Sequence, residues 1–218
     1  MGNIVLLDDL TINKIAAGEV IERPASVVKE LVENSIDAGA TVINVEIKNG
    51  GISYIRVSDN GKGFWPDDME IAFERHATSK IRQATDLEIV KTMGFRGEAL
   101  ASIAAISKVE LVSRREECDI GYKICVEGGK ITNKIEAGCP KGSTITITDL
   151  FFNTPVRYKF LKKDFTEAGY IEDVITRIAL ANPQIAIKLI NTGKTIIQTL
   201  GNGDKSNRSC WKTNYFSF

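Results

Sequence analysis

Two hydrophobic patterns alternate along the chain, and together they predict helices mixed with neighbouring strands. Apolar residues spaced three or four apart are typical of amphipathic helices, and this spacing extends over residues 10–22, 26–37, 66–77, 85–94, 98–107 and 167–183. Apolar and polar residues alternate one for one, as in half-buried strands, over residues 41–48, 53–59, 108–114, 120–127, 130–136, 143–148, 185–190 and 195–200. Because runs of neighbouring strands are separate from the helices, the pattern predicts an α+β two-layer sandwich rather than a parallel βαβ fold.

Capping and turn residues predict where several elements end. Ser26 is a preferred N-cap residue for the second helix, and Gly39 suits the left-handed position that stops it. Asn-Gly-Gly at 49–51 separates two alternating runs and predicts a hairpin turn. We expect one domain over residues 1–203, its N-terminal arm and helix included, followed by an irregular tail at 204–218 that shows little periodicity.

Composition and charge narrow the class of protein. Of the 218 residues, 43% are apolar and 26% are charged, as in soluble globular proteins. The 28 basic and 28 acidic residues balance, so global charge favours neither nucleic acid nor a membrane as a partner. The N-terminus does not resemble a secretory signal, and no apolar run approaches the length of a membrane span. Four cysteines without C-x-x-C spacing indicate reduced thiols rather than disulfides or zinc ligands.

The helix predicted at 26–37 concentrates acidic and amide side chains on one side. Glu30, Asn34 and Asp37 fall within a fan of about 60° at helical spacing. One interpretation is a solvated face, which remains the simpler account of this helix alone. The other is a catalytic face, because Glu30 could take a proton from water and Asn34 could offer an oxygen to a hard cation. Glu33 points away from this fan and is expected to be solvated.

The second predicted strand ends in a carboxylate followed by glycines. Asp59 shares the alternation face of Ile55 and Val57, so we expect it to face the core, where a carboxylate requires partners. Gly61 and Gly63 give the backbone freedom just beyond it. The segment is either a plain Asp-Asn-Gly turn or a carboxylate that accepts a hydrogen bond from an amino-bearing ring such as adenine.

Residues 94–100 form a glycine-containing loop that leads directly into a helix starting near Glu98. Such a loop exposes backbone N–H groups and a helix N-terminus, which together can hold phosphates. Its spacing matches neither the Walker nor the Rossmann pattern. The upstream residues Thr78, Ser79 and Lys80 could contact phosphate or cap a helix. His76 has no neighbouring cluster that marks it as a metal ligand.

A basic and aromatic cluster occurs near residue 160. It consists of Arg157, Lys159, Lys162 and Lys163, interleaved with Tyr158, Phe160 and Phe165. Two interpretations are open, namely contact with a DNA backbone and an amphipathic helix with a basic solvent face.

The order of these motifs resembles one family, the N-terminal ATPase region of MutL mismatch repair proteins. The segments that carry the resemblance lie at residues 15–41, 59–63, 75–81, 94–107 and 150–162, within a similarity that covers about residues 4–203. The wider superfamily includes DNA gyrase B, large heat-shock ATPases and sensor histidine kinases. The resemblance implies a Bergerat-type ATP-binding fold, in which helices cover one face of a mixed, mostly antiparallel sheet.

The resemblance also implies a role for individual residues. Glu30 resembles the general base that activates the attacking water, and Asn34 resembles the Mg²⁺ ligand. Asp59 resembles the carboxylate that binds adenine, with Gly63 beside the base, and Ser143 stands where the family usually has threonine. The segments that resemble the phosphate-holding lid comprise Thr78, Ser79, Lys80, Gly94, Phe95, Arg96, Gly97, Glu98, Ala99 and Leu100.

The function implied is Mg²⁺-dependent binding and slow hydrolysis of ATP by the N-terminal switch module of a mismatch repair protein. The expected partners are the mismatch-recognition protein MutS, a downstream nuclease or helicase, DNA bound in a weak and salt-sensitive way, and a second copy in a nucleotide-dependent homodimer. No membrane partner is expected, and the expected location is the bacterial cytoplasm, near the nucleoid.

The tail at 204–218 does not resemble the family's continuation, so we expect the family's second domain to be missing and hydrolysis to be weak. The alternative function is a truncated, non-hydrolysing module that binds nucleotide, DNA or repair partners.

Overall fold

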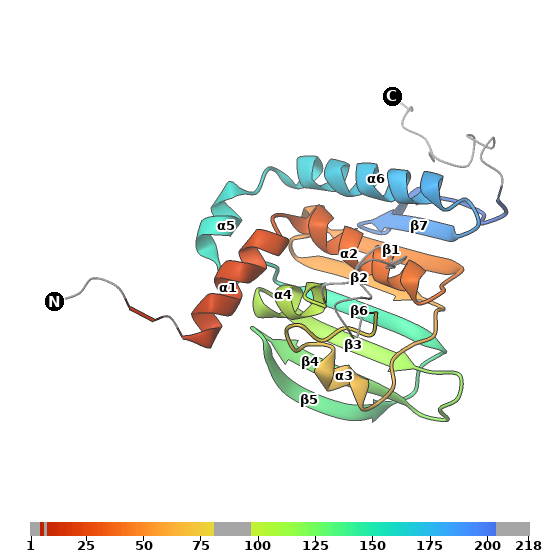
Figure 1. Ribbon diagram of the computed structural model, residues 1–218. Helices are drawn as coiled ribbons and strands as arrows, with labels where there is room; N and C mark the ends of the chain where they lie inside the picture. Colours follow the sequence, from red (N-terminus) through yellow and green to blue (C-terminus); the bar gives the residue numbers. More distant parts are fainter. Residues whose placement is uncertain (1–4, 7, 81–96, 204–218) are drawn as a thin grey trace.

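A computed structural model describes residues 5, 6, 8–80 and 97–203, and it contains one eight-stranded sheet with helices over one face (Figure 1). The strands lie in the order β5-β4-β3-β6-β2-β1-β7-β8. Their bounds are β1 Val42–Lys48, β2 Tyr54–Asp59, β3 Lys108–Arg114, β4 Gly121–Glu127, β5 Lys130–Ala137, β6 Gly142–Thr148, β7 Ala186–Asn191 and β8 Lys194–Gln198. Strands β1 and β7 pair in parallel and the other neighbours are antiparallel. The predicted mixed, mostly antiparallel sheet is therefore confirmed.

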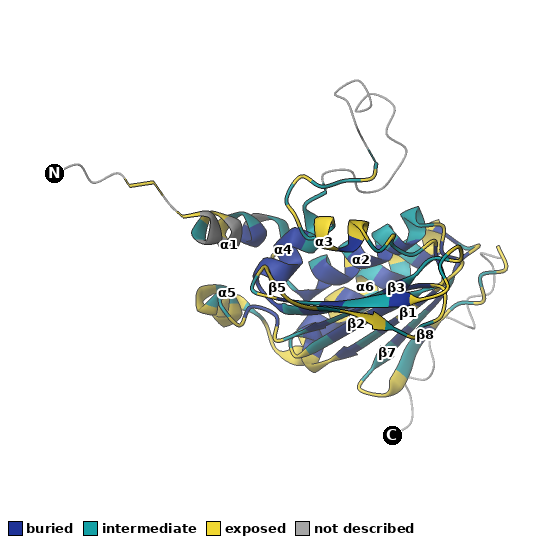
Figure 2. Ribbon diagram, turned by 90° about the horizontal axis from the view of Figure 1, so that it is seen from below, coloured by how far each residue is buried: buried dark blue, intermediate teal, exposed yellow. Residues whose placement is uncertain are grey.

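The helices of the described residues differ greatly in length. Their bounds are α1 Asp9–Val20, α2 Pro24–Asp37, α3 Asp68–Ile71, α4 Ala99–Ala105, α5 Pro155–Phe160 and α6 Asp164–Ala181, with a short 3₁₀ turn η1 at Asn49–Gly51. Helix α5 has no buried residue and lies at the margin of the molecule (Figure 2). Within residues 8–80 and 97–203, no helix combines the length and the apolar character that crossing a bilayer requires.

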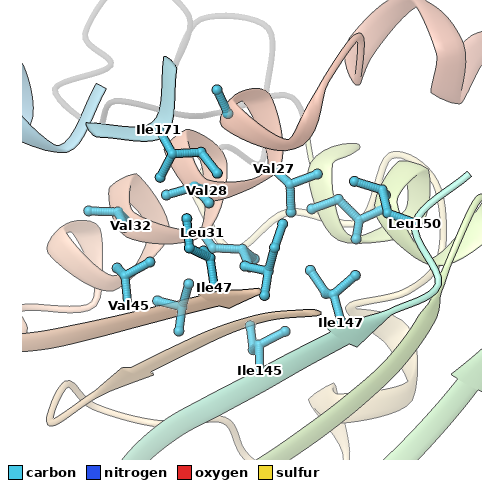
Figure 3. Close-up of a cluster of buried hydrophobic side chains, with 14 of the residues drawn as sticks. Val27, Val28, Leu31, Val32, Val45, Ile47, Ile145, Ile147, Leu150 and Ile171 are labelled. Atoms are coloured by element: carbon cyan, nitrogen blue, oxygen red, sulfur yellow. The ribbon is translucent and has the colours of Figure 1, made fainter. Parts of the chain in front are cut away.

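The core lies between the sheet and helices α2 and α6. Figure 3 shows its buried aliphatic side chains, which come from segments far apart in the sequence: Val27, Val28, Leu31, Val32, Val45, Ile47, Ile145, Ile147, Leu150 and Ile171. In β1, Ile43, Val45 and Ile47 are all buried, so the alternation seen in the sequence is the core face of the strand. Burying one such side chain contributes about 1.5–3 kcal/mol. This burial determines how α2 is rotated on the sheet.

The N-cap predicted for the second helix is wrong. Ser26 is not the N-cap of α2, because the helix begins two residues earlier at Pro24, with Arg23 at the cap position. A proline suits the first turn of a helix, since its φ is already helical and it has no N–H to leave unpaired. The hairpin predicted at 49–51 is confirmed, because residues 49–51 form a 3₁₀ turn that connects two antiparallel strands.

The helix predicted at 66–77 is wrong beyond Ile71, where α3 ends. His76 has a φ of 64°, which no α-helix accommodates, and the backbone at Ala77 lies against Gly97. Tertiary contact with residues far along the chain therefore overrides the local helical pattern. The helix predicted at 85–94 lies outside the described residues.

The η1 turn supports helix α6 through a close backbone approach. Gly50 has a φ of +62°, and a Cβ added there would lie 2.7 Å from the carbonyl oxygen of Asp164. The adjacent Asn49 donates from Nδ2 to Asp164 Oδ2 at 3.2 Å. The start of α6 is thus seated directly on the connection between β1 and β2.

Replacing Gly50 by alanine should therefore destabilise the protein more than the same change in an open turn. Gly193, in the β7–β8 turn, has a φ of +80° and no atom within 4 Å of its added Cβ. Gly193→Ala should cost about 1–2 kcal/mol for the left-handed conformation alone. Gly50→Ala should cost about 1–3 kcal/mol more for the steric overlap. Urea denaturation of both variants measures the difference in their free energies of unfolding. Equal losses of stability would show that the start of α6 can move away from the added methyl group at no cost.

Candidate functional site

Asp59, at the end of β2, is held by groups from α2 and from its own loop. Its Oδ2 accepts from the hydroxyl of Ser35 at 2.9 Å, and its Oδ1 accepts from the Gly61 N–H at 2.8 Å. Ser35 is buried on the sheet-facing side of α2. The prediction that Asp59 faces the core and has partners there is confirmed.

Burial raises the pKa of Asp59 above its ordinary value of 3.8, although three hydrogen bonds oppose the shift. These bonds come from the Gly61 N–H, the Ser35 hydroxyl and the Ser143 N–H, all of which favour the carboxylate. The net direction shows that removing this carboxylate from water outweighs the hydrogen bonds it receives. An ionised Asp59 would therefore gain from a further donor.

A second polar group of residues joins the glycine loop to strands β3 and β6. Ser113 Oγ accepts from the Phe64 N–H at 2.9 Å, donates to the Gly142 carbonyl at 2.9 Å, and lies 3.0 Å from Ser143 Oγ. Both serines are buried. Gly63 has a φ of +72°, and an added Cβ would lie 2.5 Å from the Arg114 carbonyl oxygen. This contact restricts the position to glycine and fixes the loop against β3.

The acid and amide side of α2 is partly covered by residues 78–80. Lys80 Nζ lies 2.6 Å from Asp37 Oδ2 and 3.1 Å from Asn34 Oδ1. The side chains of Lys80 and Asp37 are only 17% and 10% exposed. A solvated face is therefore wrong for Asn34 and Asp37, because a cationic side chain from a distant segment binds both.

The middle of the same helix is more open at Glu30. Glu30 keeps 29% of its side chain exposed, and its Oε1 lies 3.5 Å from Lys29 Nζ. The same ammonium lies 2.9 Å from Glu33 Oε2. Glu33 was expected to be solvated, but its side chain is 14% exposed and hence more covered than Glu30. The ammonium of Lys29, one turn before Glu33, covers it.

The structure brings the two predicted lid segments together where it describes them. An added Cβ on Gly97 would lie 2.3 Å from the Ala77 carbonyl oxygen, so the two backbones touch. His76 Nδ1 lies 3.2 Å from Glu98 Oε1. Glu98 stands at the N-cap of α4, as expected, although its side chain makes no capping bond.

The remaining lid residues have different surroundings. The Thr78 hydroxyl accepts from the Lys80 N–H at 3.2 Å, and Ser79 is exposed. Ala99 begins α4, and Leu100 packs against the hydrophobic core. Gly94, Phe95 and Arg96 were predicted to contact phosphate, and they lie outside the described residues.

The donor set around Asn34 can accept a hard cation. Within the described part of the chain, no group of three or more histidine, cysteine, aspartate or glutamate side chains could hold a metal. Mg²⁺ typically uses one or two protein oxygens, with waters and substrate phosphates completing its shell. Asn34 Oδ1 already accepts from the Lys80 ammonium, so it faces a position that suits a cation. The residues therefore fit a magnesium ion that arrives with an anionic ligand.

The basic and aromatic cluster near residue 160 differs from a simple amphipathic helix. Its aromatic residues Tyr158, Phe160 and Phe165 are exposed rather than buried. Arg157 lies against α1, with its guanidinium 2.9 Å from where a Cβ on Gly18 would stand. The predicted basic solvent face is therefore mixed with exposed aromatic side chains.

Sequence reasoning missed Ser35 and Ser113 and left Asp37 without a role. The signal for the two serines is a polar residue on a helix or strand face whose other residues are apolar. Ser35 continues the buried side of α2, and Ser113 continues the buried side of β3 after Leu111. Asp37 needed its partner Lys80, which lies 43 positions away in sequence.

The raised pKa of Asp59 predicts how stability depends on pH. In the unfolded chain Asp59 ionises near 3.8, whereas in the fold it ionises at a higher pH. Asp59 therefore reduces the free energy of unfolding as the pH rises from about 3.8 through its folded pKa. Asp59→Asn removes this loss, so the variant should gain stability relative to the parent over that pH interval. Urea denaturation at several pH values measures the difference, and a difference that is flat with pH contradicts it.

The comparisons with known proteins agree with this geometry. The model of a family described as "Histidine kinase-, DNA gyrase B-, and HSP90-like ATPase" matches residues 21–147. The DNA mismatch repair protein MutL of Caldanaerobacter subterraneus subsp. tengcongensis is 57% identical over 203 residues, and that of Thermoanaerobacter pseudethanolicus is 55% identical over 204. These matches cover 93% and 94% of this chain but 34% and 33% of the relatives. The chain thus spans about a third of the length of the curated relatives it matches.

Two solved structures are similar over most of the chain. The Aquifex aeolicus MutL ATPase domain complexed with ADP has a TM-score of 0.71 and 39% identity, and the match covers 84% of this chain and 65% of that one. The N-terminal domain of a DNA repair protein has a TM-score of 0.71 and 33% identity, with coverage of 88% and 56%. The predicted resemblance to MutL ATPase domains and the Bergerat-type fold are confirmed. The chain belongs to the histidine kinase-, DNA gyrase B- and HSP90-like ATPase family.

Proposed function

We propose that this chain is the module of a MutL-type mismatch repair protein that binds ATP with Mg²⁺ and hydrolyses it slowly. One observation carries the proposal: helix α2 holds Asp59 of β2 through Ser35, and it carries Glu30 and Asn34 one turn apart on another side. Groups suited to bind an adenine base, a metal ion and a water are thereby arranged around one rigid helix. A relative with 39% identity has been solved in complex with ADP, which supports the assignment.

Asp59 is suited to bind the adenine base. A carboxylate has about four acceptor positions, and Asp59 accepts hydrogen bonds from Ser35, Gly61 and Ser143. One position is left for the amino group of the base. This added donor favours the carboxylate that burial disfavours, so binding the base relieves part of the desolvation of Asp59. Gly61 and Gly63 have no side chains, so the backbone beyond Asp59 can lie close to its neighbours.

Asn34 and Glu30 are suited to the phosphate end. Asn34 would hold Mg²⁺, which when bound neutralises phosphate charge and orients the terminal phosphate. A neutral amide can do this without repelling the phosphates on the other side of the metal. Glu30, one turn earlier on α2, would orient a water and accept its proton at a carboxylate oxygen. Lys80, Thr78, Ser79 and the 94–100 loop would contact the phosphates.

The alternative is a module that binds nucleotide without useful turnover. The observation in its favour is Lys29, whose ammonium lies near both Glu30 and Glu33. The Lys29 ammonium lies beside the carboxylate oxygen that would have to accept a proton from water, so it competes with water for that position. A hydrolysis measurement decides between the two functions.

In a complete protein, we propose that the module binds MutS and a downstream nuclease or helicase, and pairs with a second copy when nucleotide is bound. The exposed Lys159, Lys162 and Lys163 would give weak and salt-sensitive contact with DNA. A bacterial cytoplasmic location near the nucleoid follows from this role and remains part of the proposal.

Nucleotide binding is tested by calorimetric titration with a non-hydrolysable ATP analogue. The parent chain should bind the analogue more tightly with Mg²⁺ than without it. Asp59→Asn should lose at least about tenfold in affinity, since each tenfold corresponds to about 1.4 kcal/mol, and Asn34→Ala should lose the dependence on Mg²⁺. Asp119→Asn, a change at an exposed acidic residue, is the matched control. Equal affinities for the parent, Asp59→Asn and the control would refute the base-binding role.

Hydrolysis is tested with Glu30→Ala against Glu33→Ala. Both residues contact Lys29, so each variant removes one carboxylate from beside the same ammonium. Only Glu30 is proposed as the base. Glu30→Ala should lower turnover by about 100-fold or more while nucleotide still binds. Glu33→Ala should retain turnover. If the parent binds nucleotide without hydrolysing it, the non-hydrolysing alternative is favoured. If Glu30→Ala leaves measurable turnover unchanged, Glu30 is not the base and the proposed hydrolysis loses its main support.

A further inference from the structure

The most covered ion pair near the candidate site joins two segments that the proposed mechanism leaves unconnected. The Lys80 ammonium lies 2.6 Å from Asp37 Oδ2 and 3.1 Å from Asn34 Oδ1. Asn34 and Asp37 are three residues apart on α2, so both oxygens face the same side of the helix. Lys80 thus occupies the amide oxygen to which the proposed function assigns the metal.

Lys80 and Mg²⁺ cannot both occupy this position at low energy. A protein oxygen lies about 2.1 Å from Mg²⁺, and Lys80 Nζ lies 3.1 Å from Asn34 Oδ1. If both cations contacted the same oxygen, they would be at most about 5.2 Å apart, the sum of those two distances. Lys80 and Asp37 are largely shielded from water. The repulsion between the two cations would therefore be screened only weakly. One cation must leave before the other binds.

We propose that Asp37 is a positioning residue that stores Lys80 at Asn34 in the nucleotide-free state and releases it when Mg²⁺ and nucleotide bind. This inference rests on the proposed function, because it takes Asn34 as the metal ligand. The phosphates bring new negative charge, so they replace Asp37 as the counter-ion of Lys80. The stored ammonium keeps the metal position filled by a cation until both metal and phosphates are present.

The side chain of Lys80 is suited to this exchange. Its ammonium has three donors, of which the two contacts above use two. It is a compact charge on a flexible four-carbon stem, so it can change partners without moving the helix. Asp37 lies in the last turn of α2, whose buried side chains hold it in place. The movement is therefore confined to Lys80 and its segment.

Binding of Mn²⁺ alone, followed by its electron paramagnetic resonance, tests whether Lys80 blocks the metal position. Without nucleotide, Lys80→Met should bind Mn²⁺ at least about tenfold more tightly than the parent, within the usual range for coupled sites. Lys123→Met, which removes a partly buried lysine of β4 that is paired with Glu110, controls for the lost charge. Adding Asn34→Ala to Lys80→Met should remove the gain. Equal affinities for Lys80→Met, Lys123→Met and the parent would overturn the proposal.

Asp37→Asn tests whether Asp37 holds Lys80 at Asn34 in the nucleotide-free state. Without its carboxylate partner, Lys80 is free to meet phosphates, so the ATP analogue without Mg²⁺ should bind about five- to tenfold more tightly. Glu33→Gln, on the same helix, controls for the lost negative charge. Weaker or unchanged binding by Asp37→Asn would show that the pair is only structural. Thermal unfolding of each variant confirms that it is folded.

The two experiments separate the inference from the proposed function. The Mn²⁺ titration contains no nucleotide, so its result stands even if the parent binds no ATP analogue. If the parent binds the analogue with Mg²⁺ but Lys80→Met gains no affinity for Mn²⁺, the proposed function stands. The inference that Asp37 holds Lys80 at the metal position is then refuted.

Discussion

The packing of α2 across β1 and β2 is the interaction on which the site depends. Val28, Leu31 and Val32 are buried against the sheet, and this burial leaves the helix one rotation about its axis. That rotation brings Ser35 to the Asp59 carboxylate and turns Asn34 and Asp37 toward Lys80. The hydrophobic effect thus positions polar groups that contribute little to the core themselves.

Charge burial is the second constraint, and the molecule handles it in two ways. Asp59 is paired with neutral donors, which leave its pKa raised because they do not fully compensate for lost water. Asp37 is paired with a cation at short distance. The first arrangement favours a ligand that brings a donor, whereas the second favours a ligand that brings a competing anion. An amino-bearing base and a chain of phosphates have these two properties.

The loop segments at 76–80 and 97–98 depend on contacts that are distant in sequence. His76 has a left-handed backbone, and Gly97 fits against Ala77 only because it has no side chain. Local propensity favours a helix through residue 77, but these contacts and the pairing of Lys80 with α2 require a different path.

The sequence by itself determined the strands, the rotation of α2 and the identity of Glu30, Asn34 and Asp59 as candidates. Those features follow from the spacing of apolar and polar residues along the chain. This spacing can be seen locally, because the apolar side of each element is the side that becomes buried. The tertiary structure alone decided that Lys80 pairs with Asp37, that Ser35 holds Asp59 and that Ser113 joins the glycine loop to β6. The bonds concerned join residues between 24 and 49 positions apart. No local pattern specifies such a pairing, because it depends on how the sheet brings separate elements together.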